Sequence, residues 1–476
     1  MKFISLVYVF ALIILSGIEA KAQRVLSLEQ CIKIAQNNSL DIKKGVLAKE
    51  GASINLKFSK QQLLPSLNAN SSLSYNVGRR IDPTTNSYLS QSFISQGINL
   101  NSGITLYNGG RLRKNIKKAI FDKNASEEDI EQMRRDIALL VTNTYLSILF
   151  AQESLKNLEN QYKSTKEQLV KLNKLIDAGL KPKSASLSME AQLLSDEQKL
   201  VAGNNELERN YLNLKNLLLL EDSERVEIKT PIIDMNDNGD NIALSLSELY
   251  VSALQHYPGY SAAEYRLKSS LLQRDIAKAS FLPSVSLGGG LSTNYANRAL
   301  EVTGYDQKIR ESIFIINNQE VNVGIPFSEP ITRKQIYVDQ LKNNLGFGMA
   351  LQVNIPIYNK YSSRAGLDRA KISIENQKIA KEQIAQNIKS KIQLAFADSK
   401  AAKSQYLASK KAFEAQKAAF DNAKLQYDVG GLGSYDLINA KLLFEKAQNS
   451  LLLSKYQYIF KSKILDYYLG ENLSFN

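Results

Sequence analysis

The most regular pattern in the chain is a heptad repeat of apolar positions within residues 110–178, which returns within residues 360–429. Apolar residues at this spacing form a continuous stripe along one face of a helix. At about 1.5 Å per residue, each helix would extend roughly 100 Å, so it needs neighbouring helices along its whole length. We interpret the stripe as packing rather than a ligand-stacking surface. Its positions are Leu155, Leu158, Tyr162, Thr165, Leu169, Leu172 and Ile176, then Tyr406, Phe413, Phe420 and Tyr427.

Shorter helical patterns flank both long ones. Each is about half as long as the long helices, so two placed end to end would match one of them. The steps Leu64-Pro65 and Leu282-Pro283 end two of these patterns, because proline lacks the backbone N–H that a continuing helix requires. The four short helices are predicted at residues 27–63, 184–220, 245–281 and 434–469.

Between the helices lie short segments in which apolar and polar residues alternate. This alternation predicts strands with one apolar and one polar face, and a length of about 9 to 11 residues suits a strand that crosses a membrane. Soluble hairpins alternate in the same way. The apolar positions are Leu67, Ala69, Leu73, Tyr75 and Val77; Ile98, Leu100, Ile104 and Leu106; Val285, Leu287 and Leu291; and Phe347, Met349, Leu351, Val353 and Ile355.

The same order of elements occurs twice along the chain. We therefore expect a first structural repeat at 23–220, a linker at 221–243 in the equatorial region, and a second repeat at 244–476. The second repeat is longer because of a polar stretch at 296–344, which we expect to form a long extracellular loop. The matching segments include Leu26-Ser27-Leu28 with Leu244-Ser245-Leu246, Leu64-Pro65-Ser66 with Leu282-Pro283-Ser284, and Asp177-Ala178-Gly179 with Asp428-Val429-Gly430.

Residues 1–22 have the pattern of a signal peptide. Lys2 precedes an apolar run that is too short to span a bilayer as a helix, and Ala20-Lys21-Ala22 offers a small-x-small cleavage site. We therefore expect an exported protein. No later segment is apolar for long enough to predict a helical inner-membrane protein.

Four amphipathic strands are too few to close a barrel. A bilayer tolerates β-structure only as a closed barrel without free edges, so several chains would have to contribute strands. Three copies would supply twelve strands, and two copies would supply eight. The predicted fold class is an α plus β membrane protein, with long coiled-coil helices and four transmembrane strands per chain. We favour the homotrimer.

The composition removes most enzyme classes. Cys31 and His256 are the only residues of their types, so Cys-based and multi-His metal sites are excluded, and we expect no catalytic residues, metal or cofactor. We interpret Cys31 as a small buried residue and His256 as a helix-surface residue. The net charge of +13 is spread along helical faces among Glu and Gln, which does not favour nucleic-acid binding but leaves attraction to anionic outer-membrane lipid open.

Short motifs accompany the repeated order of elements. Besides the paired Leu-Pro steps, they are Leu106-Tyr107-Asn108-Gly109-Gly110, Ile355-Pro356-Ile357-Tyr358-Asn359, and Tyr427-x-Val429-Gly430 followed by Asp436-Leu437 and Ala440. With these motifs, the chain resembles the TolC family of outer-membrane efflux and secretion channels over nearly the whole mature chain. The resemblance implies a homotrimer with a twelve-stranded barrel in the outer membrane and an α-helical tunnel in the periplasm. Its partners would be a periplasmic adaptor and an inner-membrane pump, either proton-driven or of the ABC type.

The resemblance also implies roles for residues at the periplasmic tip. Gly179 and Gly430 match the tight turns of the two tips. Asp436 matches an acidic position that lines the tunnel mouth and would favour cations, although a carboxylate that meets the dipole of a helix N-terminus is the alternative. Asn439 stands where family members have a second acidic residue. Tyr427 matches a gate tyrosine, and by its spacing it is also a stripe residue.

Two further tip positions depart from the family pattern. Leu432 stands where some members have a basic gate residue, and Ala185 stands where its acidic partner would lie. We therefore expect closure by apolar packing. The basic turn at 179–184 is either an adaptor contact or a solvated loop.

Taken together, these features predict the exit duct of a tripartite efflux or type I secretion system, which conducts substrates passively. The alternative is a periplasmic coiled-coil adaptor or tether without a pore. Amphipathic strands of membrane-spanning length distinguish the first from the second.

Overall fold

The computed structural model describes residues 24–81, 88–89, 92–221, 226–231, 245–316 and 319–470. The expected signal peptide and most of the expected linker lie outside these residues. The chain forms two compact units, and each draws on both halves of the sequence. Unit 1 combines Met1–Ser53, Phe121–Lys268 and Glu375–Asn476, and unit 2 combines Ile54–Ile120 and Ser269–Ile374.

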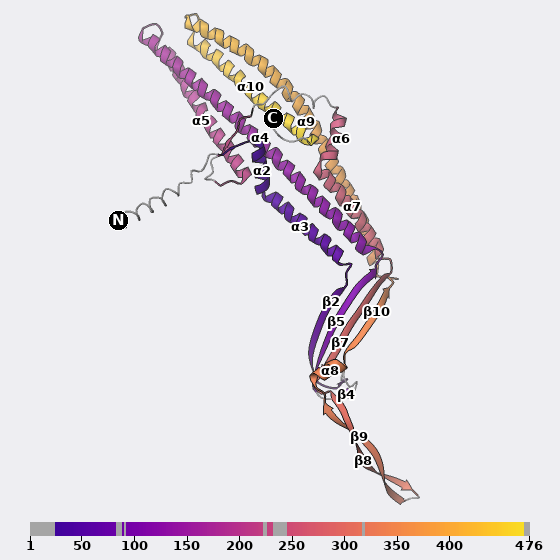
Figure 1. Ribbon diagram of the computed structural model, residues 1–476. Coiled ribbons are helices and arrows are strands. Elements are labelled where there is room, and N and C mark those ends of the chain that lie inside the picture. The colour runs from indigo at the N-terminus through magenta and orange to yellow at the C-terminus, as the bar shows by residue number, and fades with distance from the viewer. Residues whose placement is uncertain are drawn as a thin grey trace, which may run out of the picture. The chain divides into compact units, whose positions relative to one another are not determined.

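Eight of the helices described repeat one order in the two halves of the chain (Figure 1). Two long helices of 67 residues each correspond to the predicted ones and confirm their positions to within two residues. In the first half the helices are α2 (Leu28–Asn38), α3 (Leu40–Gln61), α4 (Arg111–Asp177) and α5 (Ser184–Leu218). In the second they are α6 (Leu246–His256), α7 (Pro258–Ala279), α9 (Ser362–Asp428) and α10 (Ser434–Leu469).

The predictions of unbroken helices at 27–63 and 245–281 were wrong, because each divides in two. Ser39 leaves the helical conformation between α2 and α3, and its hydroxyl accepts a hydrogen bond from the Ile42 N–H at 3.3 Å. Tyr257 is extended between α6 and α7. It precedes Pro258, whose ring disfavours a helical conformation at the preceding residue but suits the first position of a new helix.

In unit 1, the helices pack around two apolar clusters. One contains Leu28 and Cys31 of α2 with residues of α4, α5 and α10, and the other joins α6 with α9 and α10. A short parallel pair of strands, β1 (Arg24–Leu26) and β6 (Val226–Ile228), lies beside the first cluster. The hydroxyl of Tyr145 in α4 donates to the Leu26 and Lys229 carbonyl groups beside this pair.

The heptad stripes face their neighbours, as the sequence predicted. None of the seven positions from Leu155 to Ile176 is exposed, and Thr165 and Leu172 are buried. In the second stripe, Tyr406 stacks on Tyr458, with ring centroids 6.2 Å apart. Phe413 and Phe420 both pack against Phe444 of α10. The aromatic stripe is therefore part of the helix packing.

Unit 2 contains a four-stranded antiparallel sheet in the order β10-β7-β5-β2. Its strands come from both halves of the chain, and β5 pairs with β7 at the junction. Among the described strands, β2 and β10 form the two edges. The strands are β2 (Ser66–Asn76), β5 (Phe93–Tyr107), β7 (Ser284–Ala296) and β10 (Gly346–Asn354).

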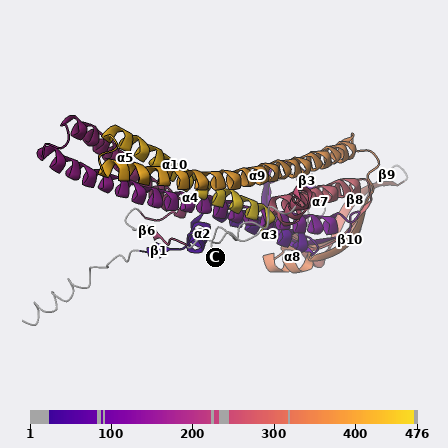
Figure 2. The same ribbon diagram turned by 90° about the horizontal axis from the view of Figure 1, so that it is seen from above.

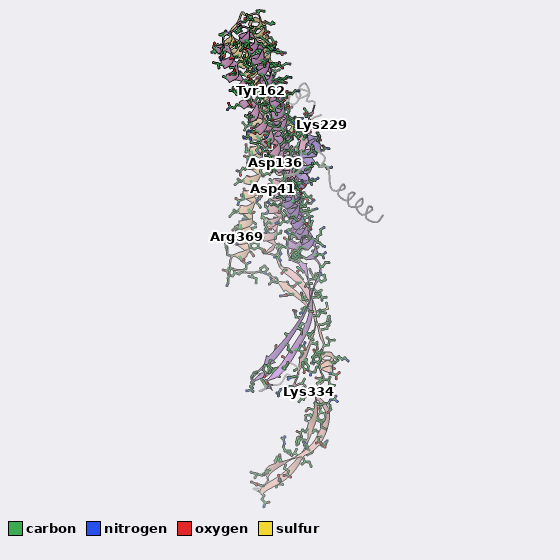
Figure 3. The ribbon with its side chains drawn as sticks, turned by 90° about the vertical axis from the view of Figure 1, so that its left-hand side faces the viewer. Asp41, Asp136, Tyr162, Lys229, Lys334 and Arg369 are labelled. Carbon is green, nitrogen blue, oxygen red and sulfur yellow. The ribbon has the colours of Figure 1, made fainter. Side chains whose placement is uncertain are left out.

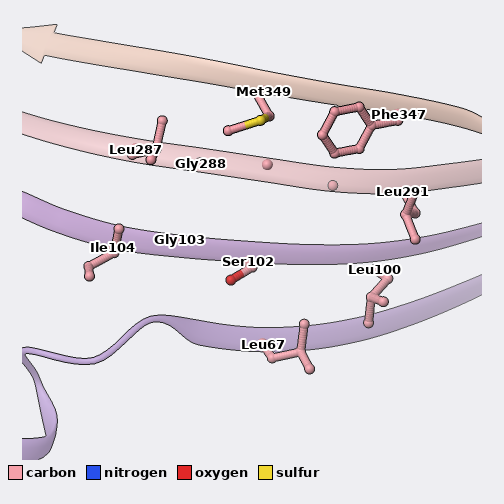
Figure 4. A pocket seen from close by; sticks show the side chains of 12 residues that line it. Leu67, Leu100, Ser102, Gly103, Ile104, Leu287, Gly288, Leu291, Phe347 and Met349 are labelled. Atoms are coloured by element: carbon pink, nitrogen blue, oxygen red, sulfur yellow. The ribbon is translucent and has the colours of Figure 1, made fainter.

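One face of this sheet is apolar and the other is polar. The apolar side chains of all four strands gather on one face, where Leu100 pairs with Leu291 and Ile104 with Leu287 (Figure 4). On the opposite face Asn68 pairs with Asn101, and glycine residues alternate with polar ones. Phe347 and Met349 on the apolar face are 72% and 65% exposed. Within this chain, the apolar face is left largely uncovered.

The region expected to be a polar loop, 296–344, is instead largely ordered secondary structure. It contains a long antiparallel hairpin of β8 (Leu300–Ile316) and β9 (Gln319–Lys334), followed by α8 (Tyr337–Asn343). Pro326 and Pro330 lie within β9. Both strands of a two-stranded hairpin are edge strands, so a proline that donates no hydrogen bond is tolerated there. A further small hairpin joins β3 (Arg80–Ile81) to β4 (Tyr88–Leu89).

Candidate functional site

Helices α4, α5, α9 and α10 form two helical hairpins that lie side by side (Figures 1 and 2), and their tips belong to unit 1. We call the α4–α5 pair hairpin 1 and the α9–α10 pair hairpin 2. Tyr162 of α4 lies closer to their tips than Asp136 does (Figure 3). The residues that the sequence singled out, from Gly179 to Asn439, occur at or near these two tips.

Both tip turns are built on glycine. Gly179 has a φ of +74° and Gly430 a φ of +82°, just beyond the ends of α4 and α9. The Gly179 N–H donates to the Ile176 carbonyl group at 2.8 Å, and the Gly430 N–H donates to the Tyr427 carbonyl group at 3.1 Å. A left-handed residue at this position ends a helix and satisfies its last carbonyl groups.

Replacing either tip glycine with alanine is expected to destabilise the protein by about 1–2 kcal/mol, the cost of placing a Cβ in the left-handed region. No heavy atom lies within 4 Å of a Cβ added at Gly179 or Gly430, so the cost would come from the backbone alone. Gly51→Ala is the matched control, because Gly51 lies inside α3 with equally open space and ordinary helical geometry. In chemical denaturation, Gly51→Ala should have a slightly higher free energy of unfolding than the parent protein. Equal changes in the free energy of unfolding at Gly179, Gly430 and Gly51 would contradict a cost that comes from the left-handed backbone.

A cavity of about 330 Å³ lies where the tips of the two hairpins meet. Its walls include Leu172 and Leu175 of α4, Tyr427 of α9 and Leu437 of α10. Three lysines, Lys171, Lys181 and Lys424, contribute to the same lining. Asp428 and Gln168 line it as well, so the cavity combines apolar walls with polar and charged side chains of both signs.

Tyr427 connects the two tips. Its ring lies beneath the Lys181 ammonium group of hairpin 1, at 5.2 Å from the ring centroid, within cation–π range. Its hydroxyl lies 3.4 Å from the Ser434 hydroxyl. The half-buried Lys181 thus spans from the basic turn of hairpin 1 to hairpin 2.

The structure places Asp436 in the first turn of α10 and Asn439 one turn later, and both are exposed. Asp436 at a helix N-terminus fits the helix-dipole alternative. An exposed carboxylate is equally available to an aqueous tunnel, so its role at a tunnel mouth stays a prediction. Leu432 and Ala185, which replace the family's polar pair, are both half-buried.

A buried ionic cluster joins the two hairpins away from the tips, and the sequence analysis did not identify it. Lys441 of α10 and Asp196 of α5 form an ion pair of 3.0 Å, and their side chains are 5% and 1% exposed. Thr165 of α4 donates to Asp196 at 2.5 Å and also contacts the Lys441 ammonium group. Lys199 and Glu445 complete the cluster, which we call the Lys441 cluster.

The cluster balances two cations against two carboxylates. Burial alone would raise the pKa of Asp196, but the Thr165 hydroxyl and the Lys441 ammonium group outweigh it, so the pKa is lowered and Asp196 stays ionised. Glu445 lies 3.2 Å from Lys441 and 3.6 Å from Lys199, but both of its carboxylate oxygens are buried without a hydrogen bond. Glu445 therefore depends on these two charges.

The heptad pattern of α4 contained one indication of the Lys441 cluster. Thr165 is a polar residue within an otherwise apolar stripe, and polar stripe positions often fix the register of packed helices. Its partners on α5 and α10 could not be paired with it from sequence, because the pairing depends on how the two hairpins align.

Cys31 and His256 have the burial that the sequence predicted. Cys31 is fully buried, which confirms its packing role, and burial raises the pKa of its thiol to about 12. His256 is exposed at the end of α6, as predicted, and its Nδ1 contacts the Ser252 carbonyl group at 2.9 Å. Over the described residues, no group of three or more His, Cys, Asp or Glu side chains could hold a metal ion. No helix in that same part of the chain has the length and apolar content needed to cross a membrane.

Two solved structures with the same fold are described as outer-membrane proteins. VceC of Vibrio cholerae, described as an outer membrane protein, aligns with a TM-score of 0.74 at 16% identity over 94% of this chain and 96% of its own. The CmeC outer membrane channel of Campylobacter jejuni aligns with a TM-score of 0.73 at 18% identity, over 93% and 85%. At these identities, the likeness establishes the fold.

Sequence comparison extends the resemblance. SilC of Salmonella typhimurium, a probable outer membrane lipoprotein, is 27% identical over 274 residues, which cover 55% of this chain and 54% of SilC. The chain spans about half the length of the curated relatives it matches. The family model of the outer membrane efflux proteins matches residues 31–218 and 249–471, in both halves of the chain. The protein therefore belongs to the outer membrane efflux protein family and is an outer-membrane protein.

Proposed function

We propose that this protein is a homotrimeric channel in the outer membrane. In this proposal it is the exit duct of a tripartite efflux or type I secretion system. Substrates would pass through it without chemical change, driven by an inner-membrane pump that a periplasmic adaptor connects to the helical hairpins. It would therefore not be an enzyme.

The observation that carries the proposal is the four-stranded sheet of unit 2. Its apolar face is exposed, its opposite face is polar, and it ends in the edge strands β2 and β10. Lipid suits the apolar face, but a sheet in lipid cannot leave its edge groups unpaired. Pairing β2 of one copy with β10 of the next would satisfy the edges, and three copies would form a barrel of twelve strands. An adaptor or tether without a pore gives no reason for such a sheet.

The repeat boundaries at 23–220, 221–243 and 244–476 fit this proposal. Each half supplies two strands to the sheet and one helical hairpin to unit 1. Three copies would then place six helical hairpins around one axis. The hairpin tips, with Gly179 and Gly430, would form the periplasmic entrance.

We further propose that the Lys441 cluster holds this entrance closed. The cluster ties α10 of hairpin 2 to α4 and α5 of hairpin 1 through side chains with almost no exposure. Closure by apolar packing, as expected from the sequence, stays a prediction, and the cluster would add a polar connection within the packed helices. Tyr427 and Lys181 would add a weaker contact at the tips themselves.

Planar-bilayer recording of the purified protein tests the channel directly. We expect stepwise conductance from folded trimers in detergent. The molar mass of the same sample establishes whether it is trimeric. Folded trimers that never conduct would reject the channel, and a folded monomer would reject the shared barrel.

Replacing Asp436 with asparagine is expected to reduce the cation preference of the channel. Three exposed carboxylates at a narrow entrance would concentrate cations, and the amide keeps the shape but removes the charge. The reversal potential in asymmetric salt measures this preference. Asp421→Asn is the control, because Asp421 is an exposed carboxylate on α9 outside the entrance turns. Unchanged selectivity in Asp436→Asn would leave the helix dipole as the role of Asp436.

A further inference from the structure

The β8–β9 hairpin is long and pairs only with itself. Its register runs from Leu300 opposite Lys334 to Ile316 opposite Gln319, in a sheet of two strands. A two-stranded hairpin by itself is at best marginally stable in water and requires a third strand or a packing surface. An ordered hairpin of this length therefore calls for a contact that one chain does not supply.

The two faces of the hairpin differ in exposure. The side chains of Tyr305, Ile309, Ile313 and Ile315 point to one face and are 65–74% exposed. We call this the bare face. The aliphatic side chains of the other face, such as Val321, Val323 and Ile331, are 37–52% exposed.

Two acidic residues, Glu311 and Glu320, lie among the apolar side chains of the bare face, but most charged side chains of the hairpin lie on the opposite face. Lys308 pairs with Glu329 across the strands on that face, and the Arg310 guanidinium group lies 4.8 Å from the centre of the Phe327 ring. These charges are already satisfied within the hairpin. On the bare face, Glu311 accepts a hydrogen bond from Asn322, and four exposed apolar side chains predominate, so this face suits a largely apolar protein surface.

The base of the hairpin is fixed in position. Gln340 of α8 is fully buried and forms two hydrogen bonds with the backbone of Ala296 at the end of β7, of 2.8 and 3.0 Å. The Gln340 side chain also donates to the Gln335 carbonyl group, and the Gln335 N–H donates to the Ala299 carbonyl group. The hairpin is therefore a directed extension of β7 and not a free loop.

The position of the β8–β9 hairpin in the chain indicates which surface its bare face contacts. The hairpin leaves β7 and returns through α8 to β10, the edge strand that would pair with a neighbouring copy. The sheet strands, at 9 to 15 residues, are already long enough to cross the lipid, so the hairpin would continue into water. Closure of the barrel would bring three such hairpins to one rim, where the effective concentration of each for the others is high.

We propose that the bare face docks onto the hairpins of the other two copies and forms a β-structured collar beyond the barrel. This inference rests on the proposed trimer. The partner surface is a second copy of this chain, which is present in equal amount wherever the barrel forms. The collar would bury Ile309 and Ile313 and strengthen the trimer.

Spin labelling of the full-length trimer tests the contact. A nitroxide on Ser328→Cys would lie on the bare face, and the buried Cys31 thiol should not react. We expect dipolar broadening that disappears when labelled copies are diluted with unlabelled ones during assembly. When Ile309→Thr/Ile313→Thr is added to the spin-labelled Ser328→Cys variant, the broadening should be lost. The trimer should also dissociate at a lower temperature.

The matched control is Val321→Thr/Val323→Thr, which removes two aliphatic side chains from the opposite face. This variant should keep both the broadening and the dissociation temperature. Trimers that conduct but show no broadening would overturn the docking proposal alone. Equal losses in the two double variants would also overturn it, because they would report hairpin stability and not docking. A monomeric, non-conducting protein would overturn the proposed function together with the collar.

Discussion

Lys441→Met is expected to destabilise the folded protein by about 3–5 kcal/mol, the usual cost of removing one partner from a buried ion pair. Asp196 would keep Thr165, Gln192 and Lys199 as partners. Glu445 would keep only Lys199, at 3.6 Å, with both carboxylate oxygens still buried. The loss therefore arises mainly from a carboxylate that cannot reach water.

The same substitution should also open the channel. Lys441 is one of the buried contacts of α10 with α4 and α5, so its removal weakens the connection between hairpins 1 and 2, although the apolar contacts of Leu452 and Tyr456 remain. Planar-bilayer recordings should show a larger open probability than in the parent protein. Chemical denaturation measures the stability change in the same preparation.

Two further variants keep this prediction testable. Lys441→Met/Glu445→Met removes both members of a pair, and replacing a buried pair with apolar residues is often neutral or stabilising, so most of the stability should return. Lys446→Met changes an exposed lysine on the same helix and should have little effect. If Lys441→Met proved as stable as Lys446→Met, the cluster would contribute nothing to the packing of the two hairpins.

Met349→Arg is expected to cost about 2–4 kcal/mol if the side chain faces the lipid near the middle of the bilayer. Met349 lies on the apolar face of β10 and is 65% exposed. A guanidinium group placed there would have to leave water. Folding into lipid vesicles, followed by urea titration, measures the loss, and the yield of assembled trimer should fall with it.

Gln352→Arg is the matched control on the same strand. Gln352 is exposed and lies on the opposite face, where it pairs with Ser286. If that face lines an aqueous pore, the added charge stays hydrated and trimer yield is preserved. Equal losses in the two variants would show that the faces do not have different environments, which would contradict the barrel.

The sequence predicted the long helices closely because their pattern is local. A stripe such as Leu155 to Ile176 repeats many times, and one helix must keep it on one side. The breaks at Ser39 and Tyr257 were missed because a single residue can leave the helix without disturbing that pattern. The hairpin within 296–344 was missed because polar residues and two prolines favour a loop, although edge strands accept both.

Part of the candidate site could likewise be predicted from the sequence, and part could not. Gly179, Gly430, Tyr427 and Asp436 follow recognisable local motifs, and the sequence could name them. The Lys441 cluster has no such motif, because its residues lie on three helices, and Lys441 is 276 residues from Thr165 and 245 from Asp196. These side chains meet only when the two hairpins pack in one register.

By itself, the sequence determined the helices, the amphipathic strands and the duplication, since periodicity and proline act on neighbouring residues. The tertiary structure alone decided which residues meet across elements. It placed Lys441 beside Asp196, gathered the apolar side chains of four strands on one uncovered face, and turned a polar stretch into a paired hairpin. These outcomes depend on strand register and helix alignment, which are set by contacts between distant parts of the chain.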